Sequence, residues 1–274
     1  MINIDALSEL PSVPFTLRIP LAGRALGDKI FPHMAVNDGF AAPTLAALGD
    51  DGRRWVEDLY SVYGVLSRTQ YVRRQALNFI AEHPNAHVIN IGCGLSQYYQ
   101  WLDNGHIHMI DVDLPVVIAM RQRLLPPINE RQTMLAVDLT DSDWWEQLQL
   151  SIQDNEPLLV IMEGVSMYLQ AAQMEHILHT VNVFAPSGSK LVLDAFNYMA
   201  IGNACWHTSL RRTGADIVWG LRYSTDLTKQ NPRLKIMEQA DVMLGYSALN
   251  DISCNSVKIF TGLPFYAMYT LGID

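Results

Sequence analysis

The chain has 274 residues, 49% of them hydrophobic and 17% charged, which is typical of a globular protein with one large core or two small ones. Its net charge is -9 and its 19 Lys and Arg residues form no basic stripe, so nucleic acid is not an expected partner. No secretion signal and no membrane-spanning apolar run is visible. Three widely spaced cysteines favour neither a disulfide framework nor a zinc site, and we expect a cytoplasmic protein.

The first 50 or so residues are interrupted by prolines and glycines around short helical stretches. This pattern predicts an N-terminal arm or lid on a larger body, although a purely structural arm fits equally well. The stretch from Trp55 to Ala81 carries an apolar stripe at helical spacing and is predicted to form one helix.

A regular alternation of apolar runs and helical stretches follows. The runs are Val88–Ile91, Ile107–Ile110, Met134–Val137, Leu158–Met162 and Leu191–Leu193. Short apolar runs of this kind predict a buried parallel sheet. Four of the five are followed by acids: Asp111 and Asp113, Asp138, Glu163, and Asp194. Each acid could be only a helix cap, but ligands of open α/β sheets bind at the carboxyl edge of the strands, so four together indicate a site.

After Asp194 the alternation stops. Residues 197–235 are predicted to be an insertion that forms a second part of the lid. Val257–Phe260 and Phe265–Leu271 alternate between apolar and polar residues, and we expect them to form a terminal pair of strands.

The central motif is the stretch from His87 to Ser96, in which a predicted strand runs into the turn Gly92-Cys93-Gly94. Such a turn presents backbone N–H groups to a nucleotide-like ligand. A dinucleotide fingerprint would have glycine at position 97, which is Gln97, and the chain has no P-loop motif. We therefore expect a ligand without a pyrophosphate. Cys93 is interpreted as a small filler of the turn, because no base accompanies it in the sequence.

S-adenosylmethionine fits these residues. Asp113 lies 21 residues after Gly92, the range in which an acid at the second strand accepts from both ribose hydroxyls. Asp138 is placed to accept from the adenine amino group while the backbone of Leu139 meets the ring edge. Glu163, at the fourth strand, is placed to meet the ammonium group.

Four segments resemble the leucine carboxyl methyltransferase superfamily, and most closely its bacterial polyketide-type O-methyltransferases, the tetracenomycin methyltransferase-like proteins. The segments are Val-Ile-Asn-Ile-Gly-Cys-Gly-Leu (88–95), Asp-Val-Asp-Leu-Pro (111–115), Val-Asp-Leu (137–139) and Met-Glu-Gly-Val-Ser-Met-Tyr-Leu (162–169). The resemblance implies an α/β, Rossmann-like class I methyltransferase sheet of seven mostly parallel strands with an antiparallel terminal strand. We expect a single domain over 1–274, divided into an arm (1–54), a cofactor-binding core (55–196), a lid insertion (197–235) and C-terminal strands (236–274).

The resemblance also implies cofactor contacts. Arg68 matches an arginine that pairs with the methionine carboxylate, for which a bidentate guanidinium is suited; the alternative is a solvated helix arginine. A basic residue of the arm, Arg24 or Lys29, matches a further contact. The remaining cofactor positions correspond to Gly92, Gly94, Asp113, Asp138, Leu139 and Glu163. In one place the chain departs from the family, which usually continues the glycine turn with Leu-Asp-Thr-Arg where this chain has Leu95-Ser96-Gln97-Tyr98.

The expected reaction is O-methylation of a small, polyketide-like carboxylate or hydroxyl. A carboxylate needs only an orienting cation, for which Arg222 is a candidate alongside Arg211 and Arg212, whereas a phenol would benefit from a base such as His207. Tyr168 is a third candidate catalytic residue, and Trp206, Trp219 and Tyr223 are candidates for an apolar wall. Each of these side chains could instead have only a packing role. The alternatives left open are a protein C-terminal carboxyl methyltransferase and a non-catalytic binder of S-adenosylmethionine; a homodimer is also left open, and no metal is expected.

Overall fold

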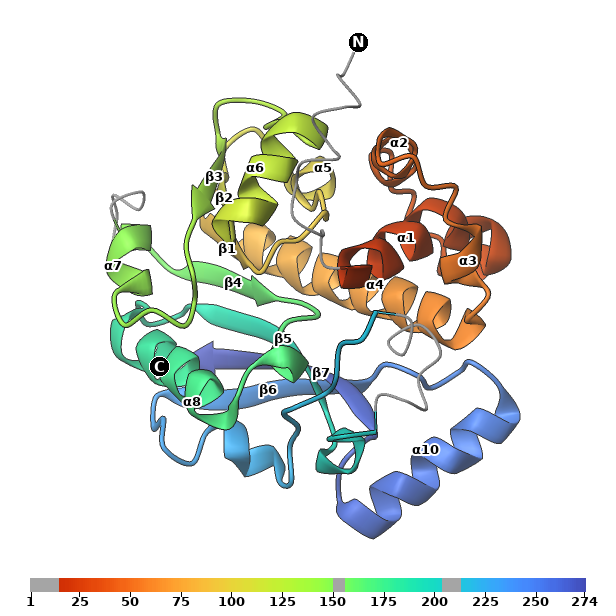
Figure 1. Cartoon of the computed structure of the whole chain (residues 1–274). Helices are drawn as coiled ribbons and strands as arrows, with labels where there is room; N and C mark the ends of the chain where they lie inside the picture. The colour runs from red at the N-terminus through yellow and green to blue at the C-terminus, as the bar shows by residue number, and fades with distance from the viewer. Residues whose placement is uncertain (1–14, 150–155, 204–212) are drawn as a thin grey trace.

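The computed structural model describes residues 15–149, 156–203 and 213–274. One seven-stranded sheet runs through the molecule in the order β3-β2-β1-β4-β5-β7-β6, with helices on both faces (Figure 1). Its strands are β1 (His87–Ile91), β2 (His108–Asp113), β3 (Gln132–Ala136), β4 (Leu158–Met162), β5 (Lys190–Phe196), β6 (Leu234–Asp241) and β7 (Tyr266–Ile273). The α-helices are α1 (Arg18–Ile30), α2 (Ala41–Ala47), α3 (Arg53–Val56), α4 (Leu59–Glu82), α5 (Tyr99–Leu102), α6 (Pro115–Leu124), α7 (Trp144–Gln149), α8 (Ala171–Phe184) and α10 (Ala248–Thr261).

The first five strands are parallel to one another, and β7 lies antiparallel between β5 and β6. Sequence order therefore reverses between β1 and β4, because the chain continues from β1 to β2 on one side of this pair and from β4 to β5 on the other. Ligands of open α/β sheets bind at such a point. The predicted seven-stranded, mostly parallel sheet with an antiparallel strand near its end is confirmed.

Alternating side chains of the strands supply two cores, one on each face of the sheet. On β1, Val88 packs into the core beneath α4, while its neighbour Ile89 packs into the core beneath α7 and α8. Both residues are fully buried. Because both faces are covered at the centre of the sheet, β1, β4 and β5 are apolar at most positions, and this explains why they were visible as apolar runs.

The helix predicted from Trp55 to Ala81 is two helices in the structure. The chain turns after α3, and α4 begins beyond Asp58, whose Oδ1 accepts a hydrogen bond from the Ser61 backbone N–H at 3.2 Å. An aspartate in this position satisfies one of the free N–H groups of a helix start, so it favours a new helix over a continuous one.

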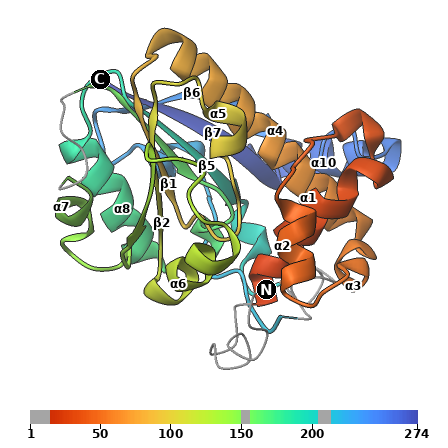
Figure 2. The same ribbon diagram turned by 90° about the horizontal axis from the view of Figure 1, so that it is seen from above.

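The N-terminal arm packs directly against α4. A Cβ atom at Gly23 would lie 3.0 Å from Val65 Cγ1, and one at Gly27 would lie 3.0 Å from Leu66 Cδ1. Glycines at these positions let α1 approach α4 closely. Figure 2 shows α1, α2 and α3 grouped beside α4 at one side of the molecule.

The prediction of a strand at Val257–Phe260 is wrong, because these residues belong to α10. Ser247 caps this helix by accepting from the Asn250 N–H at 3.2 Å, and Gly262 ends it with φ +78°. The partner of β7 is instead β6, which begins inside the stretch predicted to be an insertion. No helix within the described ranges is long and apolar enough to cross a bilayer.

Candidate functional site

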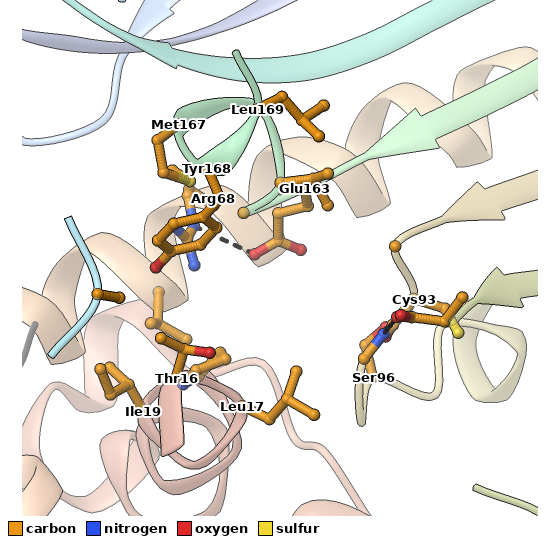
Figure 3. A pocket seen from close by; sticks show the side chains of 18 of the residues that line it. Thr16, Leu17, Ile19, Arg68, Cys93, Ser96, Glu163, Met167, Tyr168 and Leu169 are labelled. Carbon is orange, nitrogen blue, oxygen red and sulfur yellow. Dashed lines mark hydrogen bonds and ion pairs between the residues drawn. The ribbon is translucent and has the colours of Figure 1, made fainter. Parts of the chain in front are cut away.

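A cavity of about 790 Å³ lies at the carboxyl edge of the sheet. The ends of β1, β2 and β4 form its floor, and residues of the arm face them from the other side. Figure 3 shows Leu17 and Ile19 of the arm opposite Glu163, Met167 and Tyr168. The volume is in the range of small-molecule and cofactor sites.

The glycine turn forms one end of the cavity. Gly92 has φ +65° and Gly94 has φ +49°, a left-handed conformation that glycine adopts without strain. A Cβ atom at Gly92 would lie 2.2 Å from Val165 Cγ2, so the turn also needs glycine to pass beneath the loop after β4. Cys93 is buried, and its burial raises the pKa of its thiol well above the usual value, as expected for a filler of the turn.

Asp113 stands beside this turn at the end of β2. Its Oδ2 accepts from the Gly94 N–H at 2.7 Å, and its Oδ1 accepts from the Leu114 N–H at 2.8 Å. A carboxylate oxygen has two acceptor positions, so each oxygen keeps one for a ligand hydroxyl. Burial raises the pKa of the Asp113 carboxyl, against these two backbone groups, which lower it.

The end of β3 contributes Asp138 and Leu139 to the same cavity. Asp138 Oδ1 accepts from the backbone N–H and hydroxyl of Thr140, at 2.9 and 2.7 Å. Its Oδ2 has no hydrogen-bond partner within the described residues and is available to a donor. Leu139 is buried and offers an apolar surface next to it.

Arg68 and Glu163, predicted to bind opposite ends of the same amino-acid group, contact each other. Arg68 Nε donates to Glu163 Oε1 at 3.2 Å (Figure 3). Arg68 Nη1 lies 3.4 Å from Asp194 Oδ2 and donates to the Tyr266 hydroxyl. Burial would lower the pKa of the guanidinium, but Tyr266, Glu163 and Asp194 raise it well above its usual value. Arg68 therefore stays a cation, and its Nη2 has no hydrogen-bond partner in the described part of the chain.

Two further residues of this cluster, Asp194 and Tyr266, were given no individual role in the prediction of the site. Asp194 is fully buried within β5 and accepts from the Gly164 N–H at 2.8 Å and from the Tyr266 hydroxyl. Burial raises the pKa of its carboxyl, whereas Arg68 lowers it. Asp194 follows the apolar run Leu191–Leu193, and an acid in this place was a signal of the site in the sequence. The residues around Tyr266 on the last strand carry no such signal.

Arg24 and Lys29 were equal candidates for a basic residue of the arm. Arg24 is buried, lines the cavity and donates to the Leu95 carbonyl at 3.0 Å and to Asp38 Oδ2 at 2.9 Å. Lys29 is exposed at the other end of α1 and does not line the cavity. The structure thus brings Arg24 to the site.

Arg121 on α6 supports the glycine turn from below. It is fully buried, and its Nη1 donates to the carbonyls of Gly94 and Ser96 at 3.0 and 2.5 Å, while its Nη2 donates to Asp111 Oδ2 at 2.8 Å. Asp111 is therefore an internal partner of the turn and does not line the cavity. The sequence analysis did not identify Arg121, since a helix arginine is usually solvated.

The three predicted catalytic residues have different outcomes. Tyr168 lines the cavity, and burial raises the pKa of its phenol to about 12, against the effect of Arg68. Arg222 is exposed and does not line the cavity; its guanidinium lies 4.8 Å from the centre of the Tyr198 ring. Asp226 accepts hydrogen bonds from the backbone N–H groups of Arg222 and Tyr223, and these bonds turn the chain outward. His207, like Trp206, Arg211 and Arg212, lies outside the described residues.

Two of the three residues predicted to form an apolar wall are described by the structure, and neither is part of the cavity. Trp219 and Tyr223 do not line the cavity, and Tyr223 is 60% exposed. The aromatic side chains that do line it are Tyr60, Tyr168, Phe196, Phe265 and Tyr266. The described end of the insertion, Thr213 to Ala215, borders the cavity as well. No group of metal-ligating side chains is present within the described residues.

These residues fit S-adenosylmethionine. Carboxylates at the ends of β2, β3 and β4 can accept from a ribose diol, an adenine amino group and an ammonium group, and Arg68 can meet a carboxylate. The turn at Gly92 and Gly94 presents backbone without side chains at the end of β1, where a nucleotide-like ligand can approach closely.

Comparisons with known proteins agree with this geometry. A model of the family described as leucine carboxyl methyltransferase matches residues 21–182. The tetracenomycin polyketide synthesis O-methyltransferase TcmP of Streptomyces glaucescens is 31% identical over 231 residues, which cover 84% of this chain and 83% of that protein. The S-adenosyl-L-methionine-dependent methyltransferase dpfgK of Gibberella zeae is 25% identical over 256 residues, covering 86% and 84%.

Among solved structures, a presumed methyltransferase from Thermobifida fusca superposes with a TM-score of 0.59 at 14% identity, over 89% of this chain and 98% of that one. At this identity the comparison supports the fold alone. The chain therefore belongs to the leucine carboxyl methyltransferase family, and its predicted fold class and its predicted cofactor, S-adenosylmethionine, are confirmed.

Proposed function

We propose that the chain transfers a methyl group from S-adenosylmethionine to an oxygen atom, carboxylate or hydroxyl, of a small and largely apolar acceptor resembling a polyketide. The observation that carries the proposal is the division of one cavity into two parts. The charged lining residues, which are Arg24, Arg68, Asp113, Asp138 and Glu163, belong to the cofactor part, and the rest of the lining is mainly apolar or aromatic.

The apolar part lies between the arm and the loop after β4. Leu17 and Ile19 face Met167 and Tyr168 across it (Figure 3), and Phe196, Met243 and Phe265 line it further on. An apolar acceptor would be bound there by burial of its surface. The relative TcmP acts in polyketide synthesis as an O-methyltransferase, which supports an acceptor of this kind.

The cofactor supplies an activated methyl group on its sulfonium. The chain's own contribution is to bind and align the two reactants and to exclude water. In this assignment Asp113 holds the ribose, Asp138 and Leu139 hold the adenine, and Arg68 and Glu163 hold the two charged groups of the amino-acid end. Tyr168 also lines the cavity, and its phenol stays protonated at neutral pH because its pKa is about 12.

The proposal is tested in two steps. Isothermal titration with S-adenosylmethionine and with NAD comes first, and tight binding of NAD or no binding of S-adenosylmethionine would refute it. Methyl transfer is then measured with an aromatic carboxylic acid, with the matching phenol, and with a peptide that has a free C-terminal carboxylate. Transfer to the peptide alone would establish the protein carboxyl methyltransferase, and binding without transfer to any acceptor the non-catalytic binder.

The pH dependence of kcat separates the two kinds of small acceptor. A carboxylate is ionised at pH 7, so its rate should be flat near neutrality and unaffected by His207→Ala. A phenol has a pKa near 10, so its rate should rise with pH and should fall in His207→Ala if that histidine is the base.

A further inference from the structure

The triplet Ser96-Gln97-Tyr98 replaces the family's usual Asp-Thr-Arg, and the assignment above gives it no role. All three side chains are buried, with exposed fractions of 9%, 1% and 1%. Each has a defined partner. Ser96 Oγ donates to the Cys93 carbonyl at 2.8 Å, and Gln97 Oε1 accepts from Gln132 Nε2 at 2.5 Å. The Tyr98 hydroxyl donates to Glu163 Oε2.

The bond from Tyr98 reaches the cofactor part of the cavity. Its ring is held in place by an edge-on contact with Trp101, with centroids 5.6 Å apart. Because the hydroxyl sits on a rigid and buried ring, its position relative to Glu163 is fixed by the start of α5. Burial and the neighbouring Glu163 raise the pKa of the Tyr98 phenol well above its usual value, so the hydroxyl keeps its proton to donate.

Glu163 is therefore held from two sides. Oε1 receives Arg68 Nε from α4 at 3.2 Å, and Oε2 receives the Tyr98 hydroxyl from the segment after the glycine turn. One protein donor on each oxygen prevents the carboxylate from rotating, and the second acceptor position of each oxygen stays available.

We propose that Tyr98 is a positioning residue that aims the Glu163 carboxylate at the ammonium group of the bound cofactor. The inference rests on the proposed function, in which Glu163 meets that group. A tyrosine donates a hydrogen bond without bringing a positive charge. An arginine, usual at this place in the family, would bring a positive charge, whereas tyrosine supplies a neutral donor.

The test uses two ligands that share the adenosine part and a neutral sulfur. S-adenosylhomocysteine carries the amino-acid end, and 5′-methylthioadenosine lacks it. In Tyr98→Phe, which removes only the hydroxyl, the Kd of S-adenosylhomocysteine should rise about tenfold or more, the scale of a lost hydrogen bond to a charged group. The Kd of 5′-methylthioadenosine should stay within about twofold, the scale of a surface substitution.

Tyr99→Phe is the matched control. Tyr99 is the next residue, is equally buried, and donates its hydroxyl to Asn129 Oδ1 at 2.9 Å, away from the cavity. The same deletion there should change neither Kd, and thermal unfolding of all variants should show folded proteins.

Several outcomes overturn the proposal. An equal loss of both ligands in Tyr98→Phe would mean that the tyrosine only supports the loop, and unchanged affinities would mean that it has no role. Failure of the unchanged protein to bind S-adenosylhomocysteine would instead overturn the proposed function.

If Tyr98→Phe does not fold, Glu163→Gln should show the same ligand-selective loss, and equal loss of both ligands would count against the proposal. If both variants fold, their combination should lose no more affinity than the larger single loss, because the two groups act as one unit.

Discussion

Replacing Arg121 by methionine should destabilise the protein and weaken cofactor binding together. Methionine keeps a long unbranched side chain but removes the donors to Asp111, Gly94 and Ser96. Asp111 and Arg121 both have fully buried side chains. Removing one partner of a buried ion pair leaves the other charge without its counter-ion, which costs about 3–5 kcal/mol.

The lower part of this range is expected, because Asp111 keeps two other donors. Asn90 Nδ2 donates to it at 2.9 Å and Gln132 Nε2 at 2.7 Å. In a chain of this size each kcal/mol lowers Tm by about 2–4 °C, so a loss near 3 kcal/mol corresponds to roughly 6–12 °C.

Urea unfolding and thermal unfolding measure the stability of the variant. Titration with S-adenosylmethionine measures its cofactor affinity, which depends on the position of the glycine turn. Arg121→Lys is the informative control, because lysine keeps the charge for Asp111 but cannot reach both carbonyls of the turn at once. It should recover much of the stability and little of the affinity. A loss below about 1 kcal/mol in Arg121→Met would refute the reasoning, since the pair would then behave like a surface ion pair.

Three further predictions concern the cavity. Asp113→Asn should weaken S-adenosylmethionine binding by about 1–3 kcal/mol at pH 7. The unchanged protein should lose affinity for S-adenosylmethionine as the pH falls through the raised pKa of Asp113, because only the carboxylate accepts from both ribose hydroxyls. Titrations over the same pH range should show no loss of affinity in Asp113→Asn, and a loss that persists in this variant would argue against the ribose assignment. Gly92→Ala should lower the free energy of unfolding by about 2–5 kcal/mol, because alanine is strained in the left-handed conformation and its Cβ overlaps with Val165. Adding Val165→Ala should restore only the stability lost through the overlap, which urea unfolding measures. Tyr168→Phe should leave the pH profile of kcat unchanged between about pH 6 and 9; disappearance of an ionisation from that profile would identify Tyr168 as a base.

Most of the core and one side of the site could be predicted from local patterns. Val88 to Ile91 and Leu158 to Met162 form strands as expected, because strands buried on both faces are apolar at nearly every position. Asp113, Asp138 and Glu163 meet in one cavity because the carboxyl ends of parallel strands share one edge. The alternation at Val257–Phe260 was misleading, since four residues fit a strand and a helix alike, and the caps at Ser247 and Gly262 decide for the helix.

The sequence by itself determined where the first five strands lie along the chain, the glycine turn and the acids at the strand ends, since these depend on residues that are neighbours in the chain. Only the tertiary structure decided which charges meet. Arg68 reaches Glu163 across 95 residues, Asp194 across 126 and Tyr266 across 198, and Arg121 turns inward to a fully buried Asp111. The tertiary structure also explains the departure at Tyr98, 65 residues before Glu163. Such pairs leave no periodic pattern in the sequence, because hydrogen bonds between side chains depend on packing that brings distant strands and helices to one point.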